Sequence, residues 1–128
     1  MALELAFHLL RTGGRIDAHV HPMAWINAVY YVEIPAAVTH STTGAGWLHF
    51  GPPPYDDARL ADGWPLTRVQ PRAGRLVMFP SFFSHYVAPV EVDENRTTIA
   101  FEVSPVRRGA ASPEAREQPE QEWPEAQE

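Results

Sequence analysis

Hydrophobic and polar positions alternate over short stretches through most of this chain, and clusters of Gly, Pro and Asp separate those stretches. Alternation with a period of two is typical of a half-buried β-strand. A helical stripe, with apolar residues at i, i+3 and i+4, does not extend over any convincing length. We therefore predict eight strands, at residues 3–10, 15–21, 26–34, 46–51, 66–70, 75–80, 85–90 and 96–104.

Eight short strands without intervening helices favour an all-β sandwich or barrel. A small eight-stranded barrel or jelly roll has an interior just large enough for one small ligand. Residues 52–65 are too long for a tight turn, and we interpret them as a lid or substrate loop.

The alternating pattern ends near Pro105. Residues 106–128 are rich in Glu, Pro, Ala and Gln, and such a segment buries too little apolar surface to offset its ordering entropy. The sequence therefore predicts one domain over residues 1–105 and a disordered acidic tail over residues 106–128.

Composition excludes several kinds of chemistry. The chain has no cysteine, which excludes disulfides, thiolate zinc sites and cysteine nucleophiles. Its 10 basic residues are all arginine, which excludes a Schiff-base or P-loop lysine. A net charge of −6 argues against a nucleic-acid partner. The opening MALELAFHLL lacks a basic n-region, and no apolar run reaches the ~20 residues of a membrane span. We expect a cytoplasmic protein without a membrane partner, in which exposed edge strands would permit a homodimer.

Three histidines are the strongest candidates for chemistry. His19 and His21 form an H-x-H pair, and alternation along a strand would place both on one face. His85 follows the turn at Pro80 and would enter from a neighbouring strand. Imidazole is a common ligand for iron, copper, zinc and nickel, so the three predict a mononuclear metal site. Asp17 has the same parity and would be either a ligand itself or a residue that orients a histidine.

Arg96 opens the last predicted strand, and its planar guanidinium suits bidentate binding of a carboxylate. Thr98 lies on the same face and can add a hydroxyl hydrogen bond. Tyr30 and Tyr31 are both mid-strand, so one should face the interior, where a bound diacid would partner its hydroxyl; we select Tyr31. Among the other histidines, His8, His40 and His49 are weaker candidates, although His49 could line the cavity. Candidates for an apolar wall are Val29, Leu48, Phe50, Val77, Phe79 and Phe101.

Together these motifs resemble the 2-oxoglutarate/Fe(II)-dependent dioxygenases, and within them a bacterial group of which some members are joined to tetratricopeptide repeats. The matching pieces are GGRIDAHVHPMAWINAVYYVEIP, GWLHFGPP, VQPRAGRLVMFPSFFSHYVAP and NRTTIAFEVSP, in the family's order from Gly13 to Pro105. The resemblance implies a double-stranded β-helix, a jelly-roll relative of the cupins. It implies iron ligands at His19 and His85. It also places the family's basic residue for the C5 carboxylate of 2-oxoglutarate at Arg96, with Thr98 completing an R-x-S/T element.

One position departs from the family's H-x-D/E pattern, because His21 stands where the carboxylate is usual. The third ligand is then either His21 or Asp17. The resemblance implies an enzyme that uses Fe(II) and 2-oxoglutarate, and needs no catalytic side chain beyond the metal ligands. Such an enzyme would hydroxylate an unidentified substrate and release succinate. Two alternatives are a cupin-type three-histidine metalloenzyme that does not use 2-oxoglutarate, and a catalytically inactive jelly-roll module that binds a ligand.

Overall fold

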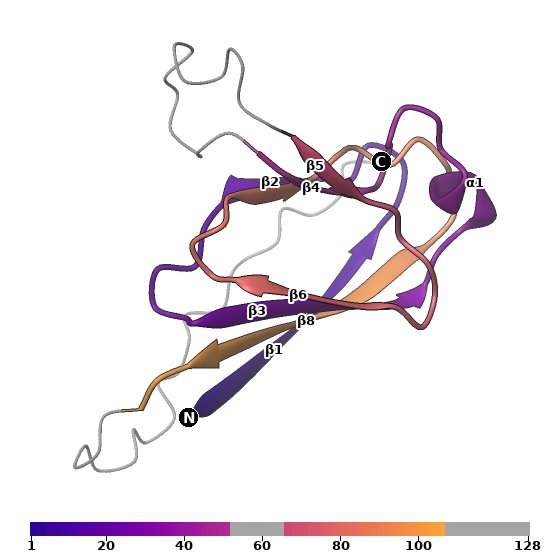
Figure 1. The fold of residues 1–128 in the computed structure, drawn as a ribbon. Coiled ribbons are helices and arrows are strands. Elements are labelled where there is room, and N and C mark those ends of the chain that lie inside the picture. The colour runs from indigo at the N-terminus through magenta and orange to yellow at the C-terminus, as the bar shows by residue number, and fades with distance from the viewer. Residues whose placement is uncertain (52–65, 107–128) are drawn as a thin grey trace, which may run out of the picture.

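The computed structural model describes residues 1–51 and 66–106, which fold into two antiparallel sheets of four strands each (Figure 1). The larger sheet has the strand order β1 (Ala2–Leu10), β8 (Arg96–Ser104), β3 (Ile26–Glu33) and β6 (Leu76–Pro80). The smaller sheet has the order β2 (Ile16–His19), β7 (His85–Val87), β4 (Leu48–Phe50) and β5 (Thr67–Val69). One short helix, α1 (Ala36–Thr39), follows β3. The predicted all-β jelly roll, a double-stranded β-helix of eight short strands, is confirmed.

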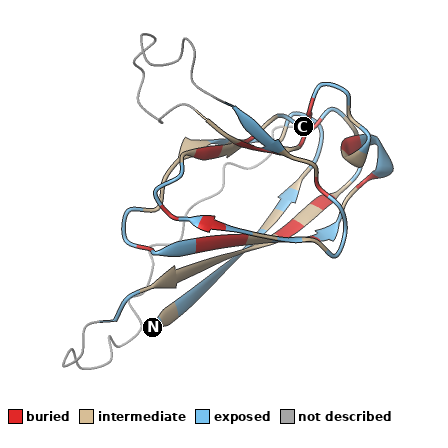
Figure 2. Cartoon of the chain, viewed as in Figure 1, coloured by how far each residue is buried: buried red, intermediate tan, exposed pale blue. Residues whose placement is uncertain are grey.

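The hydrophobic core lies between the two sheets (Figure 2). Its buried centre is Leu48 from β4, Phe79 from β6 and Val87 from β7, so both sheets contribute to one cluster. Partly buried side chains pack around this centre: Leu10, Ile16, Val29, Phe50, Val69 and Val77. Five of the six residues predicted to form an apolar wall belong to this core.

Phe101 is the exception, and its assignment to the wall is wrong. In β8, Arg96 and Thr98 are almost fully buried, which fixes the even-numbered positions of that strand on the inner face. Strand alternation then directs Phe101 to the outer face, where its register partner is the exposed Leu5 of β1.

The register of the larger sheet aligns polar side chains across its inner face. His8 of β1 is the partner of Thr98, and Thr98 is in turn the partner of Tyr31 of β3. Further along, Glu102 of β8 is the partner of Asn27, whose other neighbour is Phe79. Residues directly opposite in neighbouring strands project to the same side, so these rows face the smaller sheet.

Gly46 joins the helix region to the larger sheet. Its φ of +71° is costly for residues other than glycine, and a Cβ at this position would lie 2.9 Å from Cγ1 of Val38 in α1. The carbonyl oxygen of Gly46 accepts a hydrogen bond from Nε of Arg96, at 2.7 Å. This turn therefore holds Arg96 in place.

Several expectations concern other parts of the chain or its surroundings. The loop at 52–65 and the tail from 107 onward lie outside the described residues, so a substrate loop, the boundary at 105/106 and a disordered tail stay predictions. The homodimer also stays a prediction, although β1 is an edge strand with exposed leucines. Within the described ranges, every helix is too short to cross a membrane.

Candidate metal centre

The structure brings His19, His21 and His85 together between the sheets. His19 ends β2 and His85 begins β7, and the two are register partners in the smaller sheet. His21 lies two residues past the end of β2. One ring nitrogen from each histidine lies within 4.8 Å of the other two. The ring centroids are 4.3 Å apart for His19 and His85, and 4.8 Å apart for His19 and His21.

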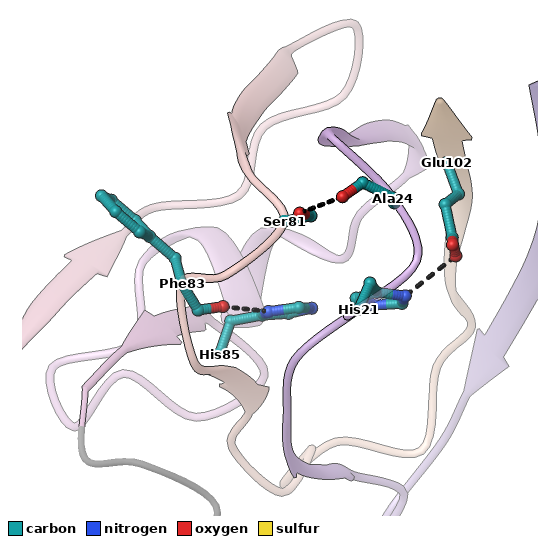
Figure 3. Close-up of polar contacts among 6 residues, drawn as sticks. All are labelled: His21, Ala24, Ser81, Phe83, His85 and Glu102. Atoms are coloured by element: carbon teal, nitrogen blue, oxygen red, sulfur yellow. Dashed lines mark hydrogen bonds and ion pairs between the residues drawn. The ribbon is translucent and has the colours of Figure 1, made fainter. Parts of the chain in front are cut away.

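The hydrogen bonds of these histidines fix which nitrogen each can offer to a metal. Nδ1 of His19 lies 2.7 Å from the carbonyl oxygen of Asp17, and Nδ1 of His85 lies 2.9 Å from that of Phe83. Nδ1 of His21 lies 2.9 Å from Oε2 of Glu102 (Figure 3). Carbonyl and carboxylate oxygens accept, so each Nδ1 carries the proton and donates it.

Three Nε2 atoms with free lone pairs remain. Fixing the tautomer through the opposite ring nitrogen is the usual arrangement around a metal-binding histidine. The donor set is thus chemically ready for a divalent transition metal.

His85 is held neutral by its surroundings. Burial lowers its pKa from 6.5 to about 4; the Phe83 carbonyl opposes this change, and the charges of His19 and His21 add to it. Phe79 contributes to the burial, with ring centroids 4.7 Å apart. A neutral imidazole at pH 7 keeps its lone pair available for a ligand bond.

Asp17 is oriented away from this cluster. Its carboxylate is exposed and pairs with Nε of Arg15 at 3.0 Å. The β2–β7 pairing shifts register between Ile16 and His19, and this irregularity separates the direction of Asp17 from that of His19. Asp17 orients His19 through its backbone carbonyl, while the carboxylate that contacts His21 belongs to Glu102.

Backbone contacts hold the segment that carries His21. The strand ends before Pro22, and the amide N–H of His21 donates to the carbonyl of Ser81 at 3.0 Å. The Ser81 hydroxyl donates to the carbonyl of Ala24 (Figure 3). The turn after His21 is thereby tied to the loop that precedes His85.

Arg96, Tyr31 and Thr98 form a second polar group on the inner face. Their exposed fractions are 1%, 0% and 1%. Nε of Arg96 donates to Gly46, but Nη1 of Arg96 and the Tyr31 hydroxyl have no hydrogen-bond partner among the described residues. The Arg96 guanidinium carbon lies 5.6 Å from the centroid of the Tyr31 ring.

These residues define a buried site suited to an anion. Burial lowers the pKa of Arg96 and raises that of Tyr31. The pair is therefore a guanidinium cation beside a neutral phenol, and each has a hydrogen-bond donor without an acceptor. A carboxylate would satisfy both.

His8 is a residue that sequence reasoning undervalued. Burial lowers its pKa, as do the charges of Arg96, His19 and His21, in that order. His8 therefore interacts electrostatically with both Arg96 and the histidine cluster. The pairing of β1 with β8 places His8 opposite Thr98, and no local pattern in the sequence predicts this contact.

His49 is buried, but strand alternation directs it to the face of the smaller sheet opposite to the core residues Leu48 and Phe50. Its Nε2 lies 3.2 Å from the carbonyl of Gly44, and its Nδ1 lies 3.1 Å from the hydroxyl of Tyr86. These contacts tie the turn before β4 to the sheet, so His49 has a structural role.

The fold is a jelly roll whose three clustered histidines could hold a metal ion, and comparison with known proteins gives the family. A family model described as "Putative 2OG-Fe(II) oxygenase" matches residues 7–102. The chain belongs to this family. The resemblance inferred from the sequence motifs is confirmed. Among curated proteins, no match was found.

Solved structures share the fold. A prolyl-4-hydroxylase from Pseudomonas putida aligns over 83% of this chain and 54% of its own, with 24% identity and a TM-score of 0.61. EvdMO1 aligns over 83% of this chain and 28% of its own, with 17% identity and a TM-score of 0.61. The chain therefore spans about half the length of the prolyl-4-hydroxylase.

Proposed function

We propose that this protein is an Fe(II)- and 2-oxoglutarate-dependent dioxygenase that hydroxylates an unidentified substrate. The observation that carries the proposal is the presence of two polar groups between the sheets. In one, a ring nitrogen from each of three histidines lies within 4.8 Å of the other two, and in the other a buried arginine and a buried tyrosine have donors without acceptors.

His19, His21 and His85 would hold the metal, with Glu102 and two backbone carbonyls keeping the rings in place. Imidazole suits Fe(II), and three protein ligands leave open coordination positions. Fe(II) with 2-oxoglutarate supplies an oxidant for a C–H bond, as 2-oxoglutarate loses carbon dioxide and becomes succinate.

Arg96 would bind the far carboxylate of 2-oxoglutarate. Nε is already used on Gly46, so Nη1 is the donor that faces a ligand. The Tyr31 hydroxyl can donate to the second carboxylate oxygen, and the buried Thr98 hydroxyl is a third possible donor. Charge-assisted bonds in a buried site are stronger than neutral ones.

Apolar side chains would keep water from the reacting groups. Phe79 packs against His85, and Phe50 packs against Phe79 with ring centroids 4.8 Å apart. Leu48 closes the same cluster from β4. By excluding water, these apolar side chains would also strengthen the electrostatic interactions around the histidines.

A specific observation favours a second candidate function. The carboxylate usual in H-x-D/E is replaced by His21, and Asp17 lies outside the cluster. A site of three neutral ligands is also consistent with a cupin-type metalloenzyme that does not use 2-oxoglutarate. The two candidates differ in what Arg96 binds.

The test is an anaerobic visible spectrum of the protein with Fe(II) and 2-oxoglutarate. We expect a weak charge-transfer band that requires both additions. It should be absent in His85→Ala, weakened at limiting 2-oxoglutarate in Arg96→Ala, and retained in the control His40→Ala, a substitution at an exposed histidine. Bound iron without a band at any 2-oxoglutarate concentration would favour the cupin-type enzyme. Failure to bind iron would refute both candidates.

A further inference from the structure

Within the described part of the chain, four buried side-chain atoms have no hydrogen-bond partner: Nη1 of Arg96, Oη of Tyr31, and both Nδ2 and Oδ1 of Asn27. The proposed carboxylate accounts for the first two. Leaving a buried polar group unpaired lowers stability, so such a group in a native structure calls for an explanation. Asn27 is 3% exposed and accounts for half of these atoms.

Asn27 is flanked by two residues that each contact a histidine of the metal site. On one side its register partner is Glu102, whose carboxylate accepts from His21. On the other side its partner is Phe79, whose ring packs against His85. Side chains directly opposite in neighbouring strands share a face, so the amide lies on the inner face between the residues that contact His21 and His85.

We propose that Asn27 binds the metal-chelating end of the cosubstrate, through a hydrogen bond from Nδ2 to an oxygen of its 2-oxo acid group. This inference rests on the proposed function. The C1 carboxylate and keto oxygens are acceptors, and a neutral amide donates to them without the repulsion that an aspartate would cause. Oδ1 remains to accept from a water or from a donor on the substrate.

Gln70 shows what a structural amide looks like in the same protein. Its Nε2 donates to the carbonyl of Thr39 at 2.8 Å, and its Oε1 accepts from Nη2 of Arg72 at 2.9 Å. Both ends of that amide are satisfied by the protein. Asn27 is more buried and neither end is satisfied, as expected of a side chain whose partner is a ligand.

The test uses the full chain loaded with Co(II) and three ligands that differ in which end of 2-oxoglutarate they contain. Oxalate has only the chelating end, glutarate has no chelating end, and 2-oxoglutarate has both. In Asn27→Leu we expect the Kd of oxalate and of 2-oxoglutarate to rise about tenfold, the loss of one hydrogen bond to a charged group. The Kd of Co(II) and of glutarate should stay within about threefold of wild type.

A second readout separates ligand binding from a structural role. Apo Asn27→Leu should melt at or above the wild-type temperature, since it removes an unpaired buried amide. The matched Gln70→Leu variant should melt lower and bind oxalate like wild type. If Asn27→Leu does not fold, Asn27→Ala is read in its place, with the same expected change in oxalate affinity.

The outcomes distinguish this inference from the proposed function. Unchanged oxalate affinity in the Asn27 variants overturns the assignment, even if the wild type turns over 2-oxoglutarate. Oxalate binding that depends on Asn27, without measurable binding of 2-oxoglutarate, keeps the role of Asn27 at the chelating group and removes the proposed cosubstrate. A Co(II)-loaded wild type that binds neither oxalate nor 2-oxoglutarate overturns both.

Discussion

Replacing Glu102 should weaken metal binding although Glu102 is not placed as a ligand. Its carboxylate holds Nδ1 of His21 at 2.9 Å and fixes the tautomer that leaves Nε2 free. A hydrogen bond to a charged group contributes about 1.5–3 kcal/mol. The side chains of His21 and Glu102 are 29% and 25% exposed, so solvent screening favours the lower end of that range.

The magnitude follows from that energy. About 1.5–2 kcal/mol corresponds to a rise of roughly 10- to 30-fold in the Kd for Co(II) in Glu102→Leu. Such a loss lies in the 10–100-fold range expected when the partner of a metal-binding histidine is removed. In Glu102→Gln the amide oxygen can still accept from Nδ1, so the Kd should rise less, by about threefold to fivefold.

The assay is a titration with Co(II), followed by visible absorption against a competing chelator. Glu4→Leu is the matched control, because Glu4 is the register partner of Glu102 on β1 and its loss removes the same charge one strand away. The reasoning is refuted if Glu102→Leu binds Co(II) like wild type, or if Glu4→Leu loses as much affinity.

Three further predictions concern stability and the carboxylate site. Burial lowers the pKa of His85 to about 4 in the folded protein, so the unfolded chain takes up the proton first as the pH falls. The free energy of unfolding of the apoprotein should therefore fall by about 1–2 kcal/mol between pH 6.5 and 4, after allowance for solvent screening. Urea titrations of His85→Leu should not show this fall, and an equal fall in the variant would show that His85 is not its cause. Arg96→Leu should raise the Kd for 2-oxoglutarate about 100-fold, the loss of about 3 kcal/mol of charge-assisted bonds. Calorimetry should show that the stability of the apoprotein is nearly unchanged, because a buried cation without an anionic partner is removed. An unchanged Kd for 2-oxoglutarate would refute the role of Arg96 in binding its carboxylate. Gly46→Ala should lower the free energy of unfolding by about 1–3 kcal/mol through its positive φ and the contact with Val38; Gly13→Ala, with a similar φ and open space, should lose less.

The strands were predictable because their alternation is local. Each predicted range overlaps an observed strand. The H-x-H pair and His85 meet in the structure as predicted, although β2 ends at His19 and His21 lies beyond the strand that was expected to carry both. The ends of strands were less predictable. The segment 85–90 yields a strand only over His85–Val87, since Pro89 cannot donate to a sheet.

The supporting residues could not be predicted, because they depend on register between distant strands. Glu102 contacts His21 because the packing of the two sheets brings β8 next to the end of β2. Asn27 lies opposite Glu102 because of the register between β3 and β8.

Two further outcomes have local causes. The register shift in β2 separates the Asp17 carboxylate from the metal-site histidines, and a single-sequence pattern does not contain this shift. The outer position of Phe101 follows from strand alternation relative to Arg96 and Thr98, so it could have been predicted from the sequence.

The most direct test of the central claim is a crystal structure of the protein loaded anaerobically with Fe(II). We expect one ion bonded to Nε2 of His19, His21 and His85 at about 2.1 Å, the usual metal–imidazole distance. The three Nδ1 hydrogen bonds, including that to Glu102, should be retained. An ion bound through Nδ1, an ion held by Asp17 in place of His21, or an ion elsewhere in the chain would contradict the account.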